Sequence, residues 1–292
     1  MSRSAFALDL GGSHVTAAEI VVEDGVARVE HRRSADVDPH GSAEAILEVV
    51  AGVMSGVTSD AVPWRLAVPG PFDLVEGVGR YRDVGKFESL YGVDVRAGLG
   101  ARLAPGSVLR FANDADAYGI GEWAFGAGRR VPRMICITLG TGVGSGFVVE
   151  GNPVDDGPDV PRDGEAHFIE IDGRPIEETV STRAIVERYR RATGATATVR
   201  EIASRVRAGQ AAAADALRGP MEALGAALHP WAERFAPEIL VVGGGMSAAW
   251  DVIGEPITRS FAYPAAEVVP GSLGEDAPLL GGASLELEHA AS

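Results

Sequence analysis

Short apolar runs that end at glycines open the chain. Residues 6–10, Phe-Ala-Leu-Asp-Leu, stop at Gly11-Gly12, a pattern typical of a buried strand followed by a tight turn. Two further segments rich in β-forming residues follow, at 15–22 and 26–32. The pattern therefore predicts strand–turn–strand, whereas a Rossmann dinucleotide site needs a helix directly after its glycines.

The same pattern recurs later in the chain. Residues 134–139 form an apolar run that leads into the glycine-rich stretch 140–146 and then into a β-forming segment at 147–150. A third glycine turn, at 243–245, follows a predicted strand. This weak internal repeat favours two related halves.

Helical spacing of apolar residues predicts the other elements. Helices are expected at 42–54, from 113 to about 125, over most of 181–235, from about 247, and from 278 to the end, and short strands at 66–68, 108–111 and 238–242.

Composition narrows the functional classes. The 292 residues carry 26 Lys+Arg against 41 Asp+Glu, a net charge of −15, so the basic footprint of a nucleic-acid-binding protein is absent. The single cysteine, Cys136, excludes a disulfide framework and a Cys-rich metal site. No apolar run is long enough to cross a membrane, and no segment has the pattern of a secretion signal. We therefore expect a cytoplasmic protein. Lys86 is the only lysine; a surface charge is the simpler interpretation, and a role in sugar binding stays open.

The glycine turns are candidate phosphate sites. Without a Cβ, backbone N–H groups can point at phosphate oxygens. One such turn alone is most simply a hairpin, but the turns at Gly11-Gly12, 140–146 and 243–245 together indicate a nucleotide tail. The chain lacks the Gly-x4-Gly-Lys-Ser/Thr motif, which excludes a P-loop NTPase.

Several acids have both a structural and a chemical interpretation. Asp9, beside the first turn, can cap that turn or hold Mg²⁺. Asp114, at the start of a predicted helix, can cap the helix or accept a proton from a substrate hydroxyl. The cluster of Glu165, His167, Glu170 and Glu177 can bind sugar hydroxyls or lie on a solvated surface.

Six motifs in order cover nearly the whole chain and resemble those of the ROK sugar kinases of the actin/hexokinase-like superfamily. In the first of them, Ser13 stands where the family usually has Thr, and the fifth, Thr-Leu-Gly-Thr-Gly-Val-Gly, is highly specific. The motifs are residues 7–13, 68–71, 111–117, 119–128, 138–144 and 241–246.

The resemblance implies the roles of the residues in these motifs. Asp114 would be the general base, ATP the phosphoryl donor, and Mg²⁺ would be bound by Asp9 directly or through water. The implied sugar contacts are Pro69, Gly70, Asn113, Asp114, Glu165, His167 and Glu177. The implied ATP and phosphate contacts are Asp9, Gly11, Gly12, Ser13, Gly140, Thr141, Gly142, Gly144, Gly243, Gly244, Gly245 and Met246.

The resemblance also implies a fold and an assembly. We expect an α/β, two-lobed actin-like (ribonuclease H-like) ATPase fold with an interlobe cleft. The N-terminal lobe would span 1–112, joined by the C-terminal helix 278–292, and the larger C-terminal lobe would span 113–277. A homodimer is the family expectation.

Two departures from the family pattern bear on the sugar. Without a gap, Phe168 stands at the family's sugar-binding His, and a one-residue slip would place His167 there. The family's zinc-binding cysteines are missing, and the short bridge 171–175 replaces their loop, so no zinc site is expected. Zinc-free relatives include polyphosphate glucokinases and kanosamine kinases. Segments 71–73, 85–87 and 90–94 look more like those of the kanosamine kinases than like those of ordinary glucokinases.

The expected activity is therefore an ATP-dependent kinase for the 6-hydroxyl of a hexose or amino-hexose, of the glucose or kanosamine/glucosamine type. Three alternatives stay open: an amino sugar rather than glucose as substrate, polyphosphate as donor, and a non-catalytic sugar-sensing regulator. Polyphosphate normally requires a cationic groove, which a chain at −15 disfavours. Family regulators carry an N-terminal helix-turn-helix, whereas the phosphate motif here begins near residue 6 and Asp114 is retained.

Overall fold

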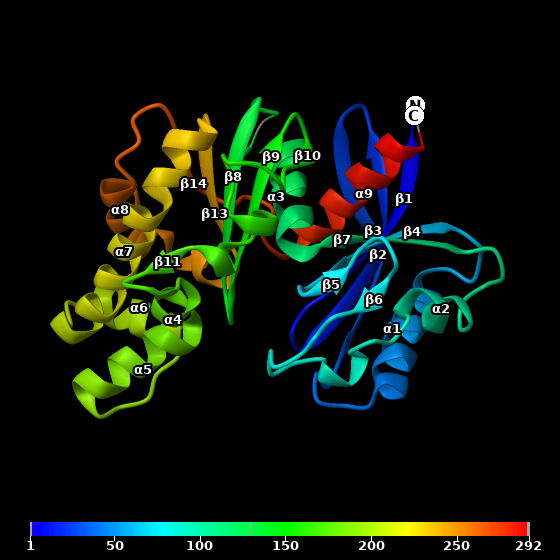
Figure 1. The fold of residues 1–292 in the computed structure, drawn as a ribbon, viewed down its shortest axis with the longest axis horizontal. Coiled ribbons are helices and arrows are strands. Elements are labelled where there is room, and N and C mark those ends of the chain that lie inside the picture. The colour runs from blue at the N-terminus through cyan, green and yellow to red at the C-terminus, as the bar shows by residue number, and fades with distance from the viewer. Residues whose placement is uncertain (1, 129, 291–292) are drawn as a thin grey trace. The chain divides into compact units, whose positions relative to one another are not determined.

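The computed structural model describes residues 2–128 and 130–290, which form two compact units (Figure 1). The first unit contains Met1–Phe125 and Asp276–Ser292, and the second contains Gly126–Glu275. This division differs from the predicted boundary at 112/113, because helix α3 (Asp114–Phe125) packs along the C-terminal helix α9 (Ala277–His289) within the first unit.

The first unit is built on a mixed five-stranded sheet in the order β3-β2-β1-β4-β7. β1 pairs antiparallel with β2 and parallel with β4, and β4 pairs parallel with β7. Helix α1 packs on β2 and β3, whereas α9 packs on β1, β4 and β2. The elements besides α3 and α9 are β1 (Arg3–Leu10), β2 (His14–Glu23), β3 (Val26–Asp36), α1 (Ala43–Val57), β4 (Pro63–Val68), β5 (Phe72–Asp73), β6 (Val78–Gly79), α2 (Val95–Gly100) and β7 (Val108–Asn113).

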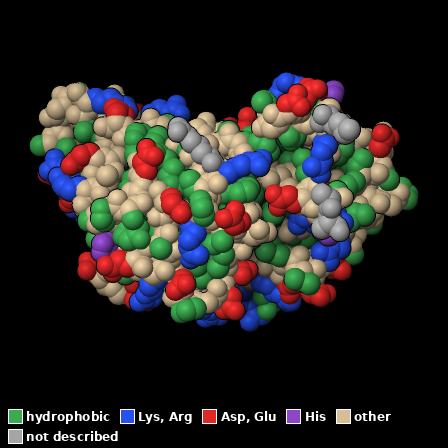
Figure 2. All heavy atoms as spheres, turned by 90° about the horizontal axis from the view of Figure 1, so that it is seen from above, with side chains coloured by type: hydrophobic (Ala, Val, Ile, Leu, Met, Phe, Trp, Pro, Cys, Tyr) green, Lys and Arg blue, Asp and Glu red, His purple; other side chains and the backbone are tan. Residues whose placement is uncertain are grey.

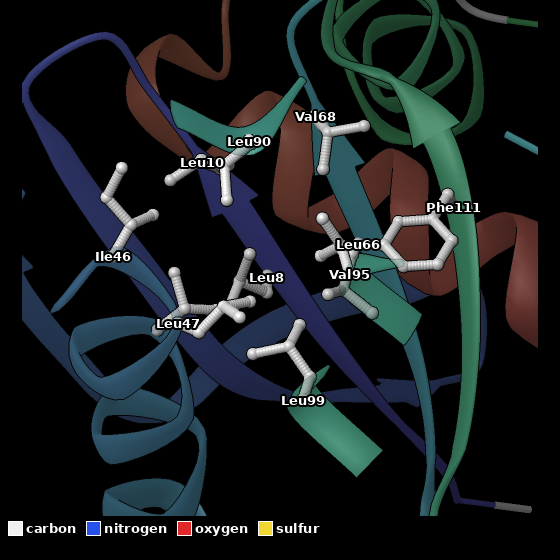
Figure 3. Close-up of a pocket in the computed structure, with 11 residues that line it drawn as sticks. Leu8, Leu10, Ile46, Leu47, Leu66, Val68, Leu90, Val95, Leu99 and Phe111 are labelled. Atoms are coloured by element: carbon white, nitrogen blue, oxygen red, sulfur yellow. The ribbon is translucent and has the colours of Figure 1, made fainter. Parts of the chain in front are cut away.

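The core of this unit lies between the sheet and α1. Leu8, Leu66 and Phe111 project from three strands toward α1 and α2, as Figure 3 shows. They surround a small cavity of about 20 Å³ whose lining is entirely apolar, so it suits neither water nor a sugar. The cavity is a packing gap and not a substrate site.

Two glycines allow α3 and α9 to touch along their backbones. A Cβ on Gly281 would lie 1.8 Å from the carbonyl oxygen of Ala117, and one on Gly121 would lie 2.1 Å from that of Ala277. Both values are far inside van der Waals contact, and backbone atoms cannot yield as a flexible side chain can. The small residues of α9 are therefore required by the close helix packing.

Replacing Gly281 with alanine is expected to lower the free energy of unfolding by about 1–3 kcal/mol, because the added methyl group forces the two helices apart. Urea unfolding followed by circular dichroism measures the change. The matched control is Gly52→Ala in α1, where nothing lies within 4 Å of the added Cβ and alanine favours the helix. Equal stability of the Gly281→Ala variant and the native protein would contradict the packing account.

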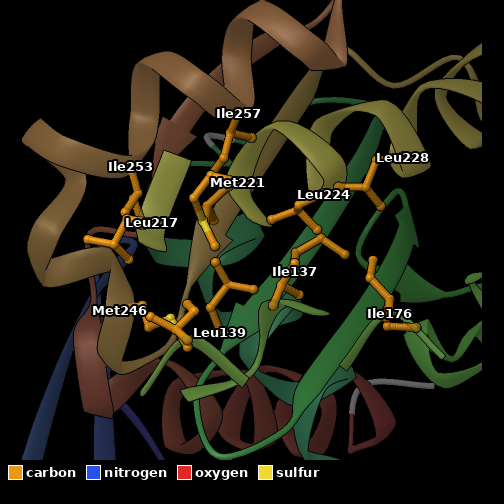
Figure 4. Packing of buried hydrophobic residues seen from close by; sticks show 14 of the residues in the cluster. Ile137, Leu139, Ile176, Leu217, Met221, Leu224, Leu228, Met246, Ile253 and Ile257 are labelled. Atoms are coloured by element: carbon orange, nitrogen blue, oxygen red, sulfur yellow. The ribbon is translucent and has the colours of Figure 1, made fainter. Parts of the chain in front are cut away.

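The second unit contains another mixed five-stranded sheet, ordered β10-β9-β8-β13-β14. Helices α7 and α8 pack against each other, and their apolar residues meet Ile137 and Leu139 of β8 in one core (Figure 4). The strands are β8 (Arg133–Leu139), β9 (Val143–Val149), β10 (Asn152–Pro153), β11 (Glu170–Ile171), β12 (Arg174–Pro175), β13 (Ile239–Gly243) and β14 (Glu267–Pro270). The helices are α4 (Glu177–Val180), α5 (Thr182–Thr193), α6 (Val199–Arg207), α7 (Ala211–Phe235) and α8 (Trp250–Phe261).

The structure confirms the predicted strand–glycine turn–strand units and revises two boundaries. β9 begins at Val143, so Gly144 lies in a strand opposite Thr138 and only 140–142 form the turn. The helix expected from about 247 begins as a 3₁₀ turn, Gly245–Ala249, and becomes α-helical at Trp250. In residues 140–146, glycines alternate with Thr, Val and Ser, a pattern that is compatible with a long loop or with a short turn before a strand. Because β9 pairs with β8 from Val143 onward, the turn is short.

The surface carries mixed charge. On the face shown in Figure 2, Asp and Glu side chains are interspersed with Arg side chains. Within residues 2–128 and 130–290, no helix combines the length and apolarity that crossing a membrane requires. Cys136 is buried on β8.

Candidate active site

Three parallel strands of the first unit end at one edge of its sheet. β4 pairs with β7 so that Val68 lies opposite Asn113, and β1 runs parallel on the other side of β4. Asp9 is the last but one residue of β1, Pro69 follows β4, and Asp114 begins α3. Ligands of α/β sheets bind outside the carboxyl ends of parallel strands, so this edge is the candidate site of the first unit.

Asn113 caps α3. Its side-chain oxygen accepts hydrogen bonds from the backbone N–H groups of Ala115, at 2.9 Å, and Asp116, at 3.2 Å. Asp114 adds one bond, accepting from the N–H of Ala115 at 2.9 Å. The sequence left open whether Asp114 is the cap, and the structure gives that task to Asn113. The Asp114 carboxylate is therefore not required to start the helix.

Burial governs the electrostatics of Asp114. The residue is half-buried, and desolvation raises the pKa of its carboxyl above the ordinary value, while the charge of Lys86 and the N–H of Ala115 oppose that rise. Desolvation penalises the charged form of a carboxylic acid. A carboxylate with a raised pKa is a stronger base, which suits proton transfer from a hydroxyl.

Tyr81 links the loop after β4 to the surroundings of Asp114. Its ring is 1% exposed, and its hydroxyl donates a hydrogen bond to the carbonyl oxygen of Pro69 at 2.9 Å. Burial raises the pKa of Tyr81, and the charge of Asp114 raises it further. Tyr81 therefore stays neutral and holds the Pro69-Gly70 backbone in place beside the start of α3.

The turn after β1 is open to a ligand. The N–H of Gly11 donates to the carbonyl of His14 at 2.8 Å, and nothing lies within 4 Å of a Cβ on Gly12. Ser13, on the same turn, is exposed, and Asp9 is half-buried just before it. Mg²⁺ usually takes one or two carboxylates together with waters and substrate phosphates, so the residues of this edge fit a nucleotide-bound Mg²⁺.

No group of three or more His, Cys, Asp or Glu side chains in the described part of the chain is arranged to hold a metal ion by itself. A metal carried on the phosphates of a nucleotide does not need such a cage.

In the second unit, a glycine turn and a carboxylate lie together. The N–H of Gly140 donates to the carbonyl of Gly142 at 3.0 Å, and the N–H of Thr182 donates to the carbonyl of Gly140 at 2.9 Å. A Cβ on Gly142 would lie 3.5 Å from Oε2 of Glu177. Thr141 and Gly142 are exposed. The turn therefore presents accessible backbone next to the half-buried Glu177 at the start of α4.

The third glycine turn packs onto the end of β8. Gly244 has φ +77°, and a Cβ there would lie 2.5 Å from the carbonyl oxygen of Leu139, so only glycine fits. Gly243 pairs with Thr138, and Gly245 starts the 3₁₀ turn. Met246 is 3% exposed as a whole residue and packs in the core of the second unit, so the structure does not present it to a ligand.

Glu165 and His167 lie on a segment that β9 anchors. Ser145, buried on β9, donates its hydroxyl to the carbonyl of Gly164 at 2.6 Å. Glu165 is half-buried, whereas His167 and Phe168 are exposed, with ring centroids 5.3 Å apart. Both candidates for the family's histidine position are therefore accessible to a ligand.

The structure thus assembles the predicted residues within each unit. The sheet edge of the first unit combines a general-base candidate, Asp114, with an acid beside an open turn, Asp9. In the second unit, the turn at 140–142 lies next to Glu177, and Gly244 packs closely on the end of β8. The first set suits proton removal and charge neutralisation, and the second suits phosphate cradling by backbone N–H groups.

Sequence reasoning missed one residue of this edge. Tyr81 lies in no recognisable motif, and its place beside Pro69 depends on the folding of the segment after β6. The only available signal was a tyrosine in a turn-rich stretch, which is too common to single out. The sequence left the role of Lys86 open, with a surface charge as the simpler interpretation; in the structure, its charge lowers the pKa of Asp114.

Comparisons with known proteins find similar sequences and a similar fold. A model of the ROK family matches residues 5–159 and 172–289. The glucokinase of Streptomyces coelicolor is 28% identical over 96% of this chain and 96% of its own length, and that of Thermotoga maritima is 26% identical over 97% and 96%. The crystal structure of a ROK family glucokinase from Streptomyces griseus in complex with glucose and AMPPNP superposes with a TM-score of 0.79, covering 97% of this chain and 99% of that one at 24% identity.

Proposed function

The chain belongs to the ROK family and is similar to glucokinases along nearly its whole length, and we propose that it transfers the γ-phosphoryl group of ATP to the 6-hydroxyl of a hexose or amino-hexose. The observation that carries the proposal is the environment of Asp114. Its carboxylate is half-buried, has a raised pKa and lies where the parallel strands β1, β4 and β7 end. Because Asn113 caps α3, the Asp114 carboxylate is not needed for that purpose.

Asp114 accepts the proton in the proposed reaction. The sugar O6 attacks the γ-phosphorus, its O–H bond breaks toward the Asp114 carboxylate, and the bond from phosphorus to the β–γ bridging oxygen breaks to release ADP. Little else is asked of the protein in phosphoryl transfer beyond positioning and charge neutralisation. The turns at Gly11-Gly12 and 140–142 supply backbone N–H groups for the phosphates. Bound Mg²⁺ would neutralise phosphate charge beside Asp9.

Glu177 is proposed to hold sugar hydroxyls. We expect Glu177→Gln to raise the KM for the sugar about tenfold or more while leaving the KM for ATP within about twofold, because an amide binds hydroxyl donors more weakly than a carboxylate. Steady-state kinetics with each substrate varied in turn measures both constants. The matched control is Glu178→Gln, an exposed neighbour on α4, which should change neither. A larger effect on the KM for ATP would contradict the assignment.

The charge of the residues proposed to contact the sugar bears on which sugar is bound. Glu165 and Glu177 are both half-buried acids, and carboxylates near a substrate favour an ammonium group over a hydroxyl. We therefore include kanosamine and glucosamine with glucose as proposed substrates. Comparing kcat/KM for the three sugars under one set of conditions decides among them: an amino-sugar preference supports the charge argument, and equal values remove it.

ATP is the proposed donor. Three glycine turns suit the compact phosphates of a nucleotide, whereas polyphosphate is a long polyanion that favours an extended cationic groove. Acidic side chains interrupt the basic ones on the face in Figure 2. A competition assay with both donors tests the choice, and faster transfer from polyphosphate would overturn it.

A further inference from the structure

The only lysine of the chain lies in a segment that is anchored on both sides. Just before Lys86, the N–H of Gly85 donates to the Glu88 carboxylate at 3.1 Å. Just after it, Phe87 is fully buried in a left-handed conformation, and its N–H donates to the carbonyl of Pro39 at 2.7 Å. Lys86 itself is half-buried. Its backbone is therefore fixed, unlike that of a charge on a loose surface loop.

A chain of aromatic contacts connects this segment to the strand that carries Asp114. The ring of Phe87 lies 5.7 Å from that of Tyr81, Tyr81 lies 6.2 Å from Phe72, and Phe72 lies 4.9 Å from Phe111 on β7. Phe111 precedes Asp114 by three residues. The hydroxyl of Tyr81 also reaches the end of β4, next to β7. The fold thus holds the 81–87 segment against the sheet edge where Asp114 begins α3.

The ionisable groups around Asp114 come from several elements. Lys86 and Tyr81 come from the segment after β6, Asp116 lies on α3 itself, and Asp9 stands at the end of β1 on the same sheet edge. Burial keeps Tyr81 neutral by raising its pKa, and Asp9 and Asp116 are acidic side chains that add no positive charge. The positive charge that acts on Asp114 is that of Lys86, which lowers the pKa of the carboxyl against the rise caused by burial.

We propose that Lys86 is a positioning residue for phosphoryl transfer: the anchored 81–87 segment holds its charge near the sheet edge where Asp114 begins α3, and that charge keeps the carboxylate in the ionised form that accepts the sugar proton. The inference rests on the proposed function. A buried general base is stronger but is more easily protonated, and a nearby cation keeps it ionised at neutral pH. Arg82 is exposed, whereas the half-buried Lys86 stands on a fixed backbone that gives its charge a defined position.

The test compares the pH dependence of kcat/KM for the native enzyme, Lys86→Met, Lys86→Arg and Arg82→Met. Removing the ammonium raises the pKa of Asp114, so the acid limb of the Lys86→Met profile should move to higher pH. Activity should fall about tenfold or more on that limb and recover at alkaline pH. Lys86→Arg keeps the charge and should keep the limb. Arg82→Met removes an exposed guanidinium that lies over the Tyr91 ring, and should leave the profile unchanged.

A second measurement does not depend on turnover. With ¹³C-labelled aspartate, the carboxyl resonance that disappears in Asp114→Asn identifies Asp114, and its titration midpoint is followed in native protein and in Lys86→Met. A higher midpoint in Lys86→Met supports the inference even if no sugar tested is phosphorylated, an outcome that would contradict only the proposed function. An unchanged midpoint overturns the inference. A raised midpoint with activity that fails to recover at alkaline pH overturns the role through Asp114.

Discussion

Replacing Asp114 with asparagine is expected to lower kcat about 10²–10⁴-fold while leaving sugar binding nearly unchanged. Asparagine has the shape of aspartate and still accepts a hydrogen bond, but it cannot take a proton from the sugar hydroxyl. The helix should start normally in the variant, because Asn113 caps α3. A coupled assay for ADP gives kcat, and calorimetric titration with the sugar gives the binding constant.

The stability of this variant provides a check on its folding. Burial raises the pKa of Asp114, so the folded protein binds this proton more readily than the unfolded chain does. The ionised carboxylate therefore lowers stability once the pH exceeds the ordinary aspartate range, and the neutral amide removes that penalty. We expect Asp114→Asn to melt at the same temperature as the native protein at pH 7, or higher.

The control for the kinetic effect is Asp116→Asn, which makes the same charge change on the same helix at a residue with no assigned role. It should retain most of the turnover. Near-normal turnover in Asp114→Asn itself, measured with a sugar that the native enzyme phosphorylates, would remove the general base from the proposed mechanism.

Replacing Glu286 with glutamine should lower the free energy of unfolding by about 3–5 kcal/mol. Glu286 is 4% exposed on α9, and its Oε1 accepts a hydrogen bond from Arg110 on β7 at 2.6 Å. Its Oε2 lies 3.5 Å from a guanidinium nitrogen of Arg65 on β4. Arg65 and Arg110 are register partners on adjacent strands, so their like charges stand side by side. The Glu286 carboxylate on α9 is the opposite charge that pairs with both guanidinium groups.

The size of the effect comes from the charges that remain. Burial lowers the pKa of Arg65, the charge of Arg110 lowers it further, and the charge of Glu286 opposes both. Without the carboxylate, two partly buried guanidinium groups face each other uncompensated. Because small domains have about 5–15 kcal/mol of stability in total, the loss is large.

Urea unfolding of Glu286→Gln tests this expectation, with Glu288→Gln as the control because Glu288 is exposed on the same helix. The control should change stability by less than about 0.5 kcal/mol. A change equally small in Glu286→Gln would show that the three charges contribute little. Replacing Glu286, Arg65 and Arg110 together with apolar residues should recover much of the lost stability, as for other buried ion networks.

Local patterns in the sequence predicted much of the fold. Strands β1, β2 and β8 and the helix α3 lie where apolar periodicity and glycine turns placed them, because each depends on residues close in sequence. Boundaries that depend on pairing partners were less accurate: β9 begins at Val143 because it pairs with β8 from the first residue after the turn. The unit to which α3 belongs was set by its packing on α9, which the sequence does not display.

The sequence predicted only part of the site, because it displays local motifs and not the contacts between residues far apart in the chain. Asp9, Asp114 and the glycine turns stand in contiguous motifs, and the structure places them at strand ends. Tyr81 and the Arg65–Glu286–Arg110 cluster depend on residues far apart in the chain and left no local signal. The roles of the individual site residues and the homodimer stay predictions, and the variants described above test the former.

The most direct test of the central claim is phosphoryl transfer by the native protein. Incubated with MgATP and glucose, kanosamine or glucosamine, the protein should form one equivalent of ADP for each phosphomonoester produced, and ³¹P–¹H correlation should place the phosphate on carbon 6 of at least one of these sugars. The 6-deoxy analogue of the accepted sugar should yield no product. Failure to phosphorylate any hexose, or attachment of the phosphate to another carbon, would contradict the account.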